Sequence, residues 1–289
     1  MELDTVNTVV GKQDIFDLRI LRLCRPCKVF FIFVKQVEKS MNILKFKNVS
    51  FSYDDKNIIS NLSFAIDRPK SVSIVGVSGC GKTTVFRLIL SLLKNTDGEI
   101  LYKEQNISTL SAYAGYMPQK DLLFPWKNIR DNLSVPMDIK GLKKNEKEEK
   151  IDEILRHMNL LDVKYKFPHE LSGGMRQRIS FARTILTGSD LLLFDEPLSA
   201  LDYITRIAMQ KWLSDTLSSY QDKTAVFITH DIDEAIFLSD EILVVKNTPI
   251  TSFEKINVSL PKPRTREMLN QSDIIDMKNH ILSLLAVKI

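Results

Sequence analysis

The chain has 289 residues, of which 44% are hydrophobic and 26% are charged, and its formal net charge is +4 at pH 7. This composition is typical of a folded globular protein, and the length allows one large domain or two modest ones around a buried core. The small net charge gives no support for nucleic-acid binding, and three cysteines argue against a disulfide framework.

The first forty residues differ from the rest, because they mix basic and apolar residues with no clear period. Their most apolar run, VFFIFV, is far shorter than the ~20 residues that a membrane-crossing helix needs. Met41 precedes an alternating strand pattern, NILKFKNVSFSY. We therefore expect residues 1–40 to be an artefact of start-site assignment or a disordered extension, and we expect a cytoplasmic protein.

Beyond Met41, apolar strand patterns alternate with helical ones. Continuous apolar runs followed by polar residues are typical of strands that are buried on both faces of a largely parallel sheet. The expected strands are 62–66, 71–77, 191–197 and 225–230, and the expected helices are 82–93 and about 143–160. The charge run at 143–150 is interpreted as a solvated helix face.

The stretch GVSGCGKT follows a predicted strand, opens a predicted helix and matches GxxxxGK[ST]. Glycines at this spacing let backbone N–H groups wrap phosphates at the positive end of a helix. A chance glycine-rich turn is the alternative, which the flanking strand and helix disfavour. We expect Lys82 to reach the β- and γ-phosphates of ATP, Thr83 to bind Mg²⁺ and Thr84 to assist. The expected loop residues are Gly76, Ser78, Gly79, Cys80 and Gly81; no role is assigned to the Cys80 side chain.

Asp195 and Glu196 end the apolar run LLLFDEP. Beside a phosphate-binding loop, Asp195 is expected to hold Mg²⁺ and Glu196 to polarise the attacking water. The alternative is an exposed strand end that carries two acids. His230 ends another strand and is expected to sense the γ-phosphate and orient the water, although a lone histidine is more often structural.

The stretch LSGGMRQRIS closely resembles the signature motif of ATP-binding-cassette (ABC) ATPases. The resemblance implies that Ser172, Gly173 and Gly174 complete the ATP site of a second subunit in a head-to-tail homodimer. It also implies that Gln119 contacts Mg²⁺ and that Asp202, in SALD, lies at the dimer interface. Tyr53 resembles the residue that stacks on adenine; its alternative role is that of an ordinary strand aromatic.

The implied fold is an α/β P-loop NTPase with a RecA-like core, an antiparallel β subdomain and an inserted α-helical subdomain. The expected domain covers 41–270, its helical subdomain covers about 120–185, and a C-terminal helix covers 271–289.

The stretch LLFPWKNIRDNLSVPM resembles the ATPases of nitrate, sulfonate and taurine importers. This resemblance implies a partner permease at the cytoplasmic face of the membrane and, indirectly, an extracytoplasmic solute-binding protein. Trp126 is expected either to lie exposed as part of a socket for the permease or to pack into the helical subdomain. Two alternatives remain: an importer for another small organic solute, such as a thiamine precursor, and a soluble ABC ATPase outside transport. The transported solute cannot be read from this chain.

Overall fold

The computed structural model describes residues 16–22, 30–36, 42–67, 70–199, 201–219 and 222–285, the first two ranges as backbone alone. The chain divides into two compact units, Met1–Met41 and Asn42–Ile289. In the first unit, strands β1 (Phe16–Arg22) and β2 (Phe30–Gln36) pair antiparallel. The expectation that residues 1–40 are disordered or a start-site artefact, and the expected start at Met41, concern mainly residues 1–15, 23–29 and 37–41. These residues lie outside the described ranges.

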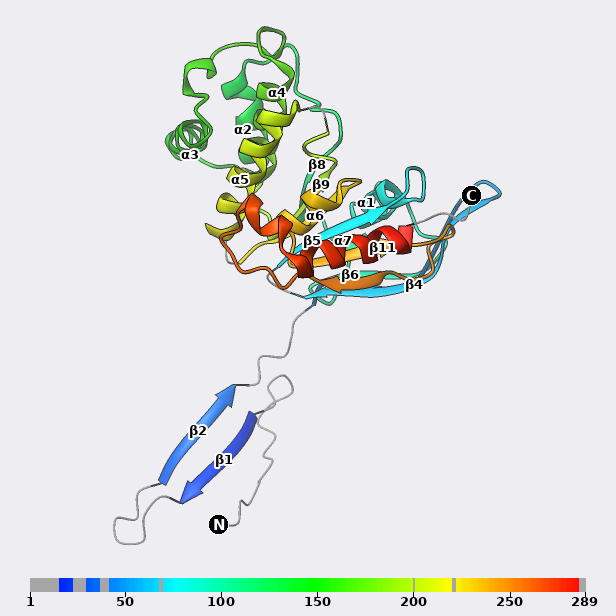
Figure 1. Cartoon of the computed structure of the whole chain (residues 1–289). Helices are drawn as coiled ribbons and strands as arrows, with labels where there is room; N and C mark the ends of the chain where they lie inside the picture. The colour runs from blue at the N-terminus through cyan, green and yellow to red at the C-terminus, as the bar shows by residue number, and fades with distance from the viewer. Residues whose placement is uncertain are drawn as a thin grey trace. The chain divides into compact units, whose positions relative to one another are not determined.

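The second unit is built on a six-stranded sheet with the order β12-β11-β5-β10-β9-β8 (Figure 1). Five strands are parallel and β12 pairs antiparallel at one edge. The strands are β5 (Ser71–Gly76), β8 (Ala114–Met117), β9 (Leu191–Asp195), β10 (Thr224–Thr229), β11 (Glu241–Val245) and β12 (Glu254–Asn257). Every residue of β5, β9, β10 and β11 is buried, as continuous apolar runs predict.

A second sheet, with the order β4-β3-β6-β7, is entirely antiparallel. Its strands are β3 (Asn42–Tyr53), β4 (Lys56–Asp67), β6 (Asp97–Tyr102) and β7 (Gln105–Asn106). Together with α1 (Lys82–Ile89), this sheet buries one face of the parallel sheet. Leu191 and Leu193 of β9 face this side, whereas Leu192 and Phe194 face the other, because successive strand residues alternate.

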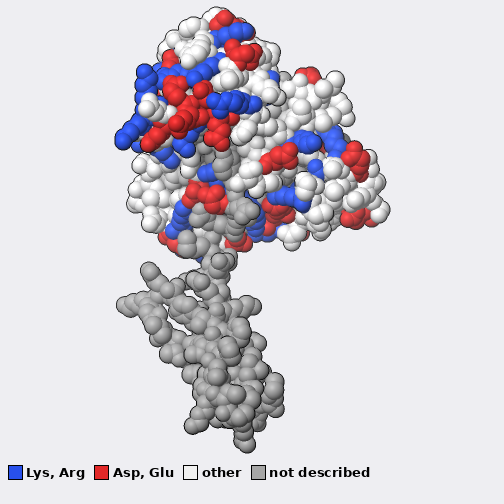
Figure 2. Space-filling view, turned by 90° about the vertical axis from the view of Figure 1, so that its left-hand side faces the viewer, with Lys and Arg blue, Asp and Glu red and all other residues white. Residues whose placement is uncertain are grey.

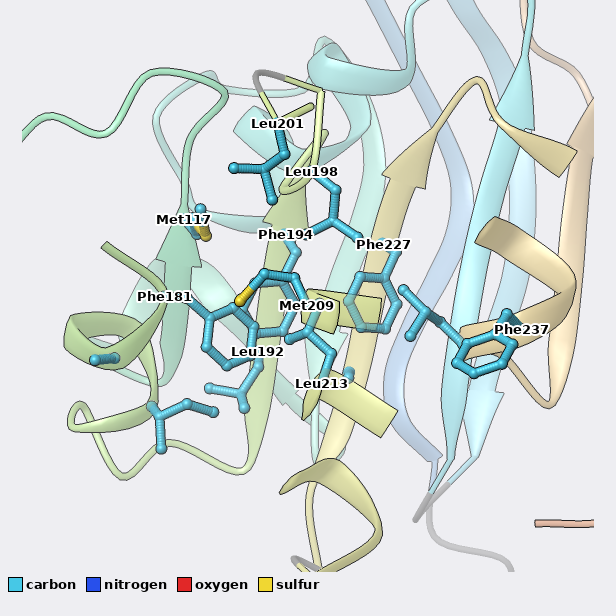
Figure 3. Close-up of a cluster of buried hydrophobic side chains, with 14 of the residues drawn as sticks. Met117, Phe181, Leu192, Phe194, Leu198, Leu201, Met209, Leu213, Phe227 and Phe237 are labelled. Carbon is cyan, nitrogen blue, oxygen red and sulfur yellow. The ribbon is translucent and has the colours of Figure 1, made fainter. Parts of the chain in front are cut away.

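The opposite face of the parallel sheet is covered by helices α4 (Gly173–Ile185), α5 (Tyr203–Ser219) and α6 (Ile232–Leu238). Its centre is an aromatic row in which Phe181 stacks on Phe194 at 4.7 Å and Phe194 stacks on Phe227 at 5.0 Å (Figure 3). Figure 3 also shows Leu198 and Leu201 beside this row. The loop after β9 is therefore anchored in the core by two leucines.

Helices α2 (Ile129–Ile139) and α3 (Lys144–His157) join α4 in a helical group inserted between β8 and β9. Figure 2 shows Lys and Arg interspersed with Asp and Glu over this part of the molecule. Glu148 accepts hydrogen bonds from Arg130 and Lys164, which lie on either side of it in the sequence. At 143–150 all residues except Lys147 and Glu148 are exposed, so the charge run forms a solvated face, as predicted.

The C-terminal helix α7 (Ser272–Leu285) lies within the predicted range; it buries Ile274 and Ile281 and leaves Leu282 exposed. Arg264, just before it, is buried and donates hydrogen bonds to the carbonyls of Ile236 and Ser239 at 2.7 Å each. It thereby satisfies backbone acceptors at the end of α6. No helix in the part of the chain that the structure describes is both long and apolar enough to span a lipid bilayer.

Candidate nucleotide-binding and catalytic site

The predicted phosphate-binding loop connects the end of β5 to the start of α1. Gly79 and Gly81 have φ values of +77° and +107°, a region that glycine adopts without strain. A Cβ atom on Gly76 would lie 2.9 Å from both Cys80 Sγ and Val245 Cβ. All three glycines are therefore required by the backbone of the loop itself.

The Lys82 side chain bends back over this loop. Its Nζ donates hydrogen bonds to the carbonyls of Gly76 at 2.8 Å and Val77 at 2.9 Å, and the residue is only 7% exposed. The ammonium group is therefore held at the loop. Among the other predicted residues of the loop and helix start, Ser78 is exposed and Thr84 is buried. The Cys80 side chain packs in the hydrophobic core, so a ligand in the loop could contact only the Cys80 backbone.

Asp195 ends β9 opposite the first turn of α1. Its carboxylate oxygens lie 3.4 Å from Thr83 Oγ1 and 3.4 Å from the hydroxyl of Tyr116. Burial raises the pKa of the Asp195 carboxyl above its usual value. Burial and the Asp195 charge raise the pKa of Tyr116 to about 12, so Tyr116 remains a neutral donor. The sequence analysis did not assign Tyr116 to the site. The only feature of the sequence that could have indicated it is its position on the strand just before Gln119.

Glu196 follows at a strained position, with φ at +49°. Its backbone N–H donates to the Ile228 carbonyl at 2.9 Å, which fixes the turn against β10. Gln119 Nε2 donates to Glu196 Oε2 at 3.0 Å, and His230 Nδ1 lies 3.5 Å from Glu196 Oε1. The structure thus brings Gln119, Glu196 and His230 together, each from the end of a different parallel strand.

The signature residues begin helix α4. Ser172 Oγ accepts a hydrogen bond from Met175 N at 3.3 Å and caps the helix. A Cβ atom on Gly173 would meet only Arg176 Nη2 at 3.9 Å, whereas one on Gly174 would lie 3.2 Å from Leu201 Cδ2. Gly174 is therefore needed for packing inside the chain, while the exposed Gly173 leaves the helix N-terminus open to a ligand.

Two other predicted residues, Asp202 and Tyr53, lie outside this cluster. Asp202 Oδ1 accepts from Thr205 N at 3.0 Å, and hydrogen bonds from Thr205 lower the pKa of Asp202. Tyr53 is exposed on β3, with its hydroxyl 3.4 Å from Arg87 Nη1. Figure 1 shows α4, which begins at the signature residues, apart from α1, which begins at Lys82. A single chain therefore does not unite Ser172 with Lys82.

The segment after Gln119 is tied to the signature helix. Asp121 Oδ2 accepts from Arg176 Nε at 3.0 Å, and the Asp121 carbonyl accepts from Ser180 Oγ and Arg183 Nη2 at 3.0 and 2.9 Å. The sequence interpretation did not assign these residues. Their effect is to connect Gln119 mechanically to α4.

Trp126, farther along this segment, is 72% exposed and lies 5.5 Å from the Phe124 ring. The alternative that Trp126 packs into the helical subdomain was therefore wrong.

A glycine loop before a helix, a buried lysine and acids at the end of β9, which β10 separates from β5 in the sheet, define a P-loop NTPase. A family model described as ABC transporter matches residues 59–199. The formylaminopyrimidine import ATP-binding protein ThiZ of Halalkalibacterium halodurans is 39% identical over 219 residues, or 75% of this chain and 84% of that protein. The taurine import ATP-binding protein TauB of Rhizobium johnstonii is 41% identical over 194 residues, or 66% of this chain and 72% of that protein.

Among solved structures, the dimeric post-hydrolysis state of the ATP-binding cassette MJ0796 with ADP and Pi is similar, with a TM-score of 0.65 and 25% identity. The similarity covers 75% of this chain and 100% of that one. The chain therefore belongs to the ABC transporter family, and it is an ATPase of that family.

Proposed function

We propose that this chain is the ATP-hydrolysing subunit of an importer, which works as a homodimer on a separate permease at the cytoplasmic face of the membrane. The observation that carries the proposal is the segment from Gln119 to Trp126. It touches the catalytic Glu196 at one end, is bonded to α4 in the middle, and exposes an aromatic side chain at the other. A movement of this segment can therefore connect ATP hydrolysis to a bound partner.

The residues at the site fit ATP with Mg²⁺. Thr83 and Asp195 present a hydroxyl and a carboxylate, the oxygen ligands that Mg²⁺ prefers, and Gln119 adds an amide oxygen. Across the described residues, no three His, Cys, Asp or Glu side chains form a metal site, so phosphate oxygens and water would complete the coordination. Glu196 then orients the attacking water, with His230 beside it.

The homodimer is supported by the position of the signature. The N-terminus of α4 is open at Gly173 and carries the positive end of the helix dipole, which favours a phosphate. Because α4 lies apart from the chain's own phosphate-binding loop, that phosphate belongs to ATP on a second copy. The similar MJ0796 cassette is dimeric.

The permease partner is supported by the exposed Trp126, which lies beside the half-buried Phe124. Large exposed aromatic side chains are typical of surfaces that bind another protein. Arg183 lies 5.9 Å from the Phe124 ring, so the pair is attached to α4 as well as to the segment that carries it. This surface is the proposed socket for a permease helix.

The proposed solute is a small molecule or ion of the nitrate, sulfonate or taurine type. The similarity to a taurine import protein supports this choice, and the similarity to a formylaminopyrimidine import protein supports a thiamine precursor as the second candidate. The solute would be selected by the permease and an extracytoplasmic binding protein. The ATPase chain does not distinguish the two.

The test uses a Glu196→Gln variant, because this change removes the charge and keeps the hydrogen-bonding shape. We expect hydrolysis to fall by about 10²- to 10³-fold while ATP binding persists and a dimer accumulates on a sizing column. Glu149→Gln, an exposed carboxylate on α3, is the matched control. Unchanged turnover in Glu196→Gln would remove the assigned role.

The same tagged variant, incubated with ATP in detergent-solubilised native membranes, tests the partner. Recovery of a polytopic permease supports the importer, and a co-purified binding protein identifies the solute by its ligand. Recovery of soluble partners alone, with none of the chain in the membrane fraction, would contradict the importer and support a soluble ABC ATPase.

A further inference from the structure

Glu234 is a buried carboxyl next to the catalytic residues that the proposed function leaves without a role. It lies in the first turn of α6, is 4% exposed, and its Oε1 has no hydrogen-bond partner among the described residues. Burial of a carboxylate with one oxygen left without a partner is costly, so the group is expected to be neutral. Burial, followed by the charge of Asp231, raises the pKa of Glu234 to about 8.

The groups that face Glu234 come from three other elements. Asp231, which precedes α6, accepts from Glu234 N at 3.1 Å, and the hydroxyl of Thr229 on β10 bonds to the Glu234 carboxyl. Arg206 on α5 and Glu196 after β9 supply the other nearby charges. Arg206 Nη1 lies 4.0 Å from Asp231 Oδ2. Glu234 therefore belongs to the cluster that holds the His230 loop.

Arg206 also touches the loop that carries Asp202. Its Nη2 donates to the Leu201 carbonyl at 3.0 Å, and its backbone N–H donates to the Asp202 carbonyl at 2.8 Å. Its Nε is buried and, like Glu234 Oε1, has no hydrogen-bond partner among the described residues. The Arg206 guanidinium thus contacts the SALD loop at Leu201 and also lies beside Asp231, the residue that follows His230.

Arg206 and Glu234 line a common cavity of about 20 Å³, together with Glu196, Ser199 and His230. This volume is enough for one water molecule, which needs two to four polar partners to be stable in an interior. The two buried polar atoms without partners belong to residues of this lining. The cavity is therefore polar, of the right size and next to the catalytic carboxylate.

We propose that Arg206 and Glu234 are positioning residues that share one bound water in this cavity and so hold the SALD loop and the His230 loop in a fixed relation beside Glu196. The water accepts from Arg206 Nε–H and exchanges a hydrogen bond with the Glu234 carboxyl. A displacement of the SALD loop at the dimer interface then reaches His230 within the same chain. This inference rests on the proposed roles of Glu196 and His230, but it does not require the importer.

The test compares steady-state ATP hydrolysis by purified full-length variants between pH 6 and 9. Arg206→Met keeps an unbranched apolar stem and removes the guanidinium N–H groups, so kcat should fall by about tenfold with little change in KM. Arg206→Lys, which keeps a donor, should recover part of the activity. Arg156→Met changes an arginine that is 61% exposed and is the matched control.

Glu234→Gln keeps a hydrogen-bonding side chain and removes the titration. Wild-type kcat should decrease above pH 8 as Glu234 ionises, and the decrease should be weaker in Glu234→Gln. The double variant Arg206→Met/Glu234→Gln should lose no more activity than Arg206→Met alone, because both residues act through the same water. A crystal structure of Glu196→Gln with ATP should show that water.

Three results would overturn the inference: Arg206→Met with a kcat within twofold of wild type, losses that add in the double variant, or a crystal structure with no water in the cavity. If Arg206→Met does not fold, as thermal unfolding will show, Arg206→Lys and Glu234→Gln still test the pH profile. If Glu196→Gln does not hydrolyse ATP while Arg206→Met keeps the wild-type kcat, the shared water is contradicted and the proposed role of Glu196 stands. Failure to recover a permease would contradict only the importer.

Discussion

The amide of Gln119 donates a 3.0 Å hydrogen bond to the carboxylate of Glu196. His230 faces the other oxygen of the same carboxylate at 3.5 Å. Glu196 is therefore held on both sides by residues that follow two other strands. The orientation of a general base determines whether it reaches the attacking water. With Glu196 in the proposed role of general base, we expect Gln119 to act on hydrolysis through Glu196 as well as through the proposed Mg²⁺ contact.

Gln119→Ala should consequently lower kcat more than it weakens ATP binding. We expect a fall in kcat of about tenfold, because Glu196 loses one of its two side-chain contacts. Lys120→Ala, at the exposed neighbouring position, is the control. The measurement is ATP hydrolysis at saturating ATP together with the dissociation constant of ATP. A pure loss of ATP affinity would show that Gln119 acts only in binding.

Much of this site could be predicted from the sequence, because its parts are encoded locally. The spacing from Gly76 to Thr83 fixes a loop and a helix start, and the apolar run before Asp195 fixes the strand that presents the acids. Both features depend on neighbouring residues alone. The helix predicted at 82–93 ends at Ile89, and the structure has bends and turns in the residues that follow.

The remaining residues depend on contacts between distant segments. Tyr116 meets Asp195 across 79 positions, and Asp121 meets Arg176 across 55. Arg206 and Glu234 lie on separate helices and line the same cavity because β9 and β10, which precede these helices, are neighbours in the sheet. No local pattern reports such pairs. The exposure of Trp126 likewise depends on how α2 and α4 pack, and the sequence left it open.

A mixture of two inactive variants should regain activity if the ATP site is shared between copies. Lys82→Ala removes the ammonium group that is proposed to bind the phosphates, and Gly173→Asp places a negative side chain at the open N-terminus of α4. Each homodimer should be inactive. In a mixed dimer, one site combines both defects and the other has neither, so a random mixture should recover at most about a quarter of wild-type activity.

The measurement is ATP hydrolysis as the ratio of the two variants is changed at constant total protein. Activity should be greatest at equal amounts. Gly173→Ala is the control for folding, because a Cβ atom there meets only Arg176 Nη2 at 3.9 Å. A mixture that stays inactive at every ratio, although mixed dimers are recovered with two affinity tags, would contradict a shared site.

Phe227→Ala should destabilise the ATPase unit. Phe227 is fully buried and stacks on Phe194 at 5.0 Å, so its removal leaves a cavity that the rigid sheet cannot close (Figure 3). The expected loss is about 3–5 kcal/mol in the free energy of unfolding, measured by urea titration. Leu282→Ala, at a side chain that is 54% exposed, should change it by less than about 0.5 kcal/mol. Equal losses in both variants would contradict this account of the core.

Glu234 should make the unfolding free energy depend on pH in the direction opposite to that of a paired carboxylate. Its pKa is raised from 4.5 to about 8 in the folded chain, so the folded state holds the proton more tightly than the unfolded state. The Glu234 contribution is therefore fully present below pH 4.5, decreases as the pH rises toward 8, and is lost above it. We expect wild type to lose stability relative to Glu234→Gln across this window.

The measurement is the difference in unfolding free energy between wild type and Glu234→Gln from pH 5 to 9, because the difference cancels the other titrating groups. Glu149→Gln, at an exposed site, should give a difference that does not change with pH. A flat difference for Glu234→Gln would mean that the carboxyl is already ionised in the folded chain at pH 5. Arg206 would then have to pair with that charge directly, and the cavity beside Glu196 would hold an ion pair instead of a neutral acid and a water.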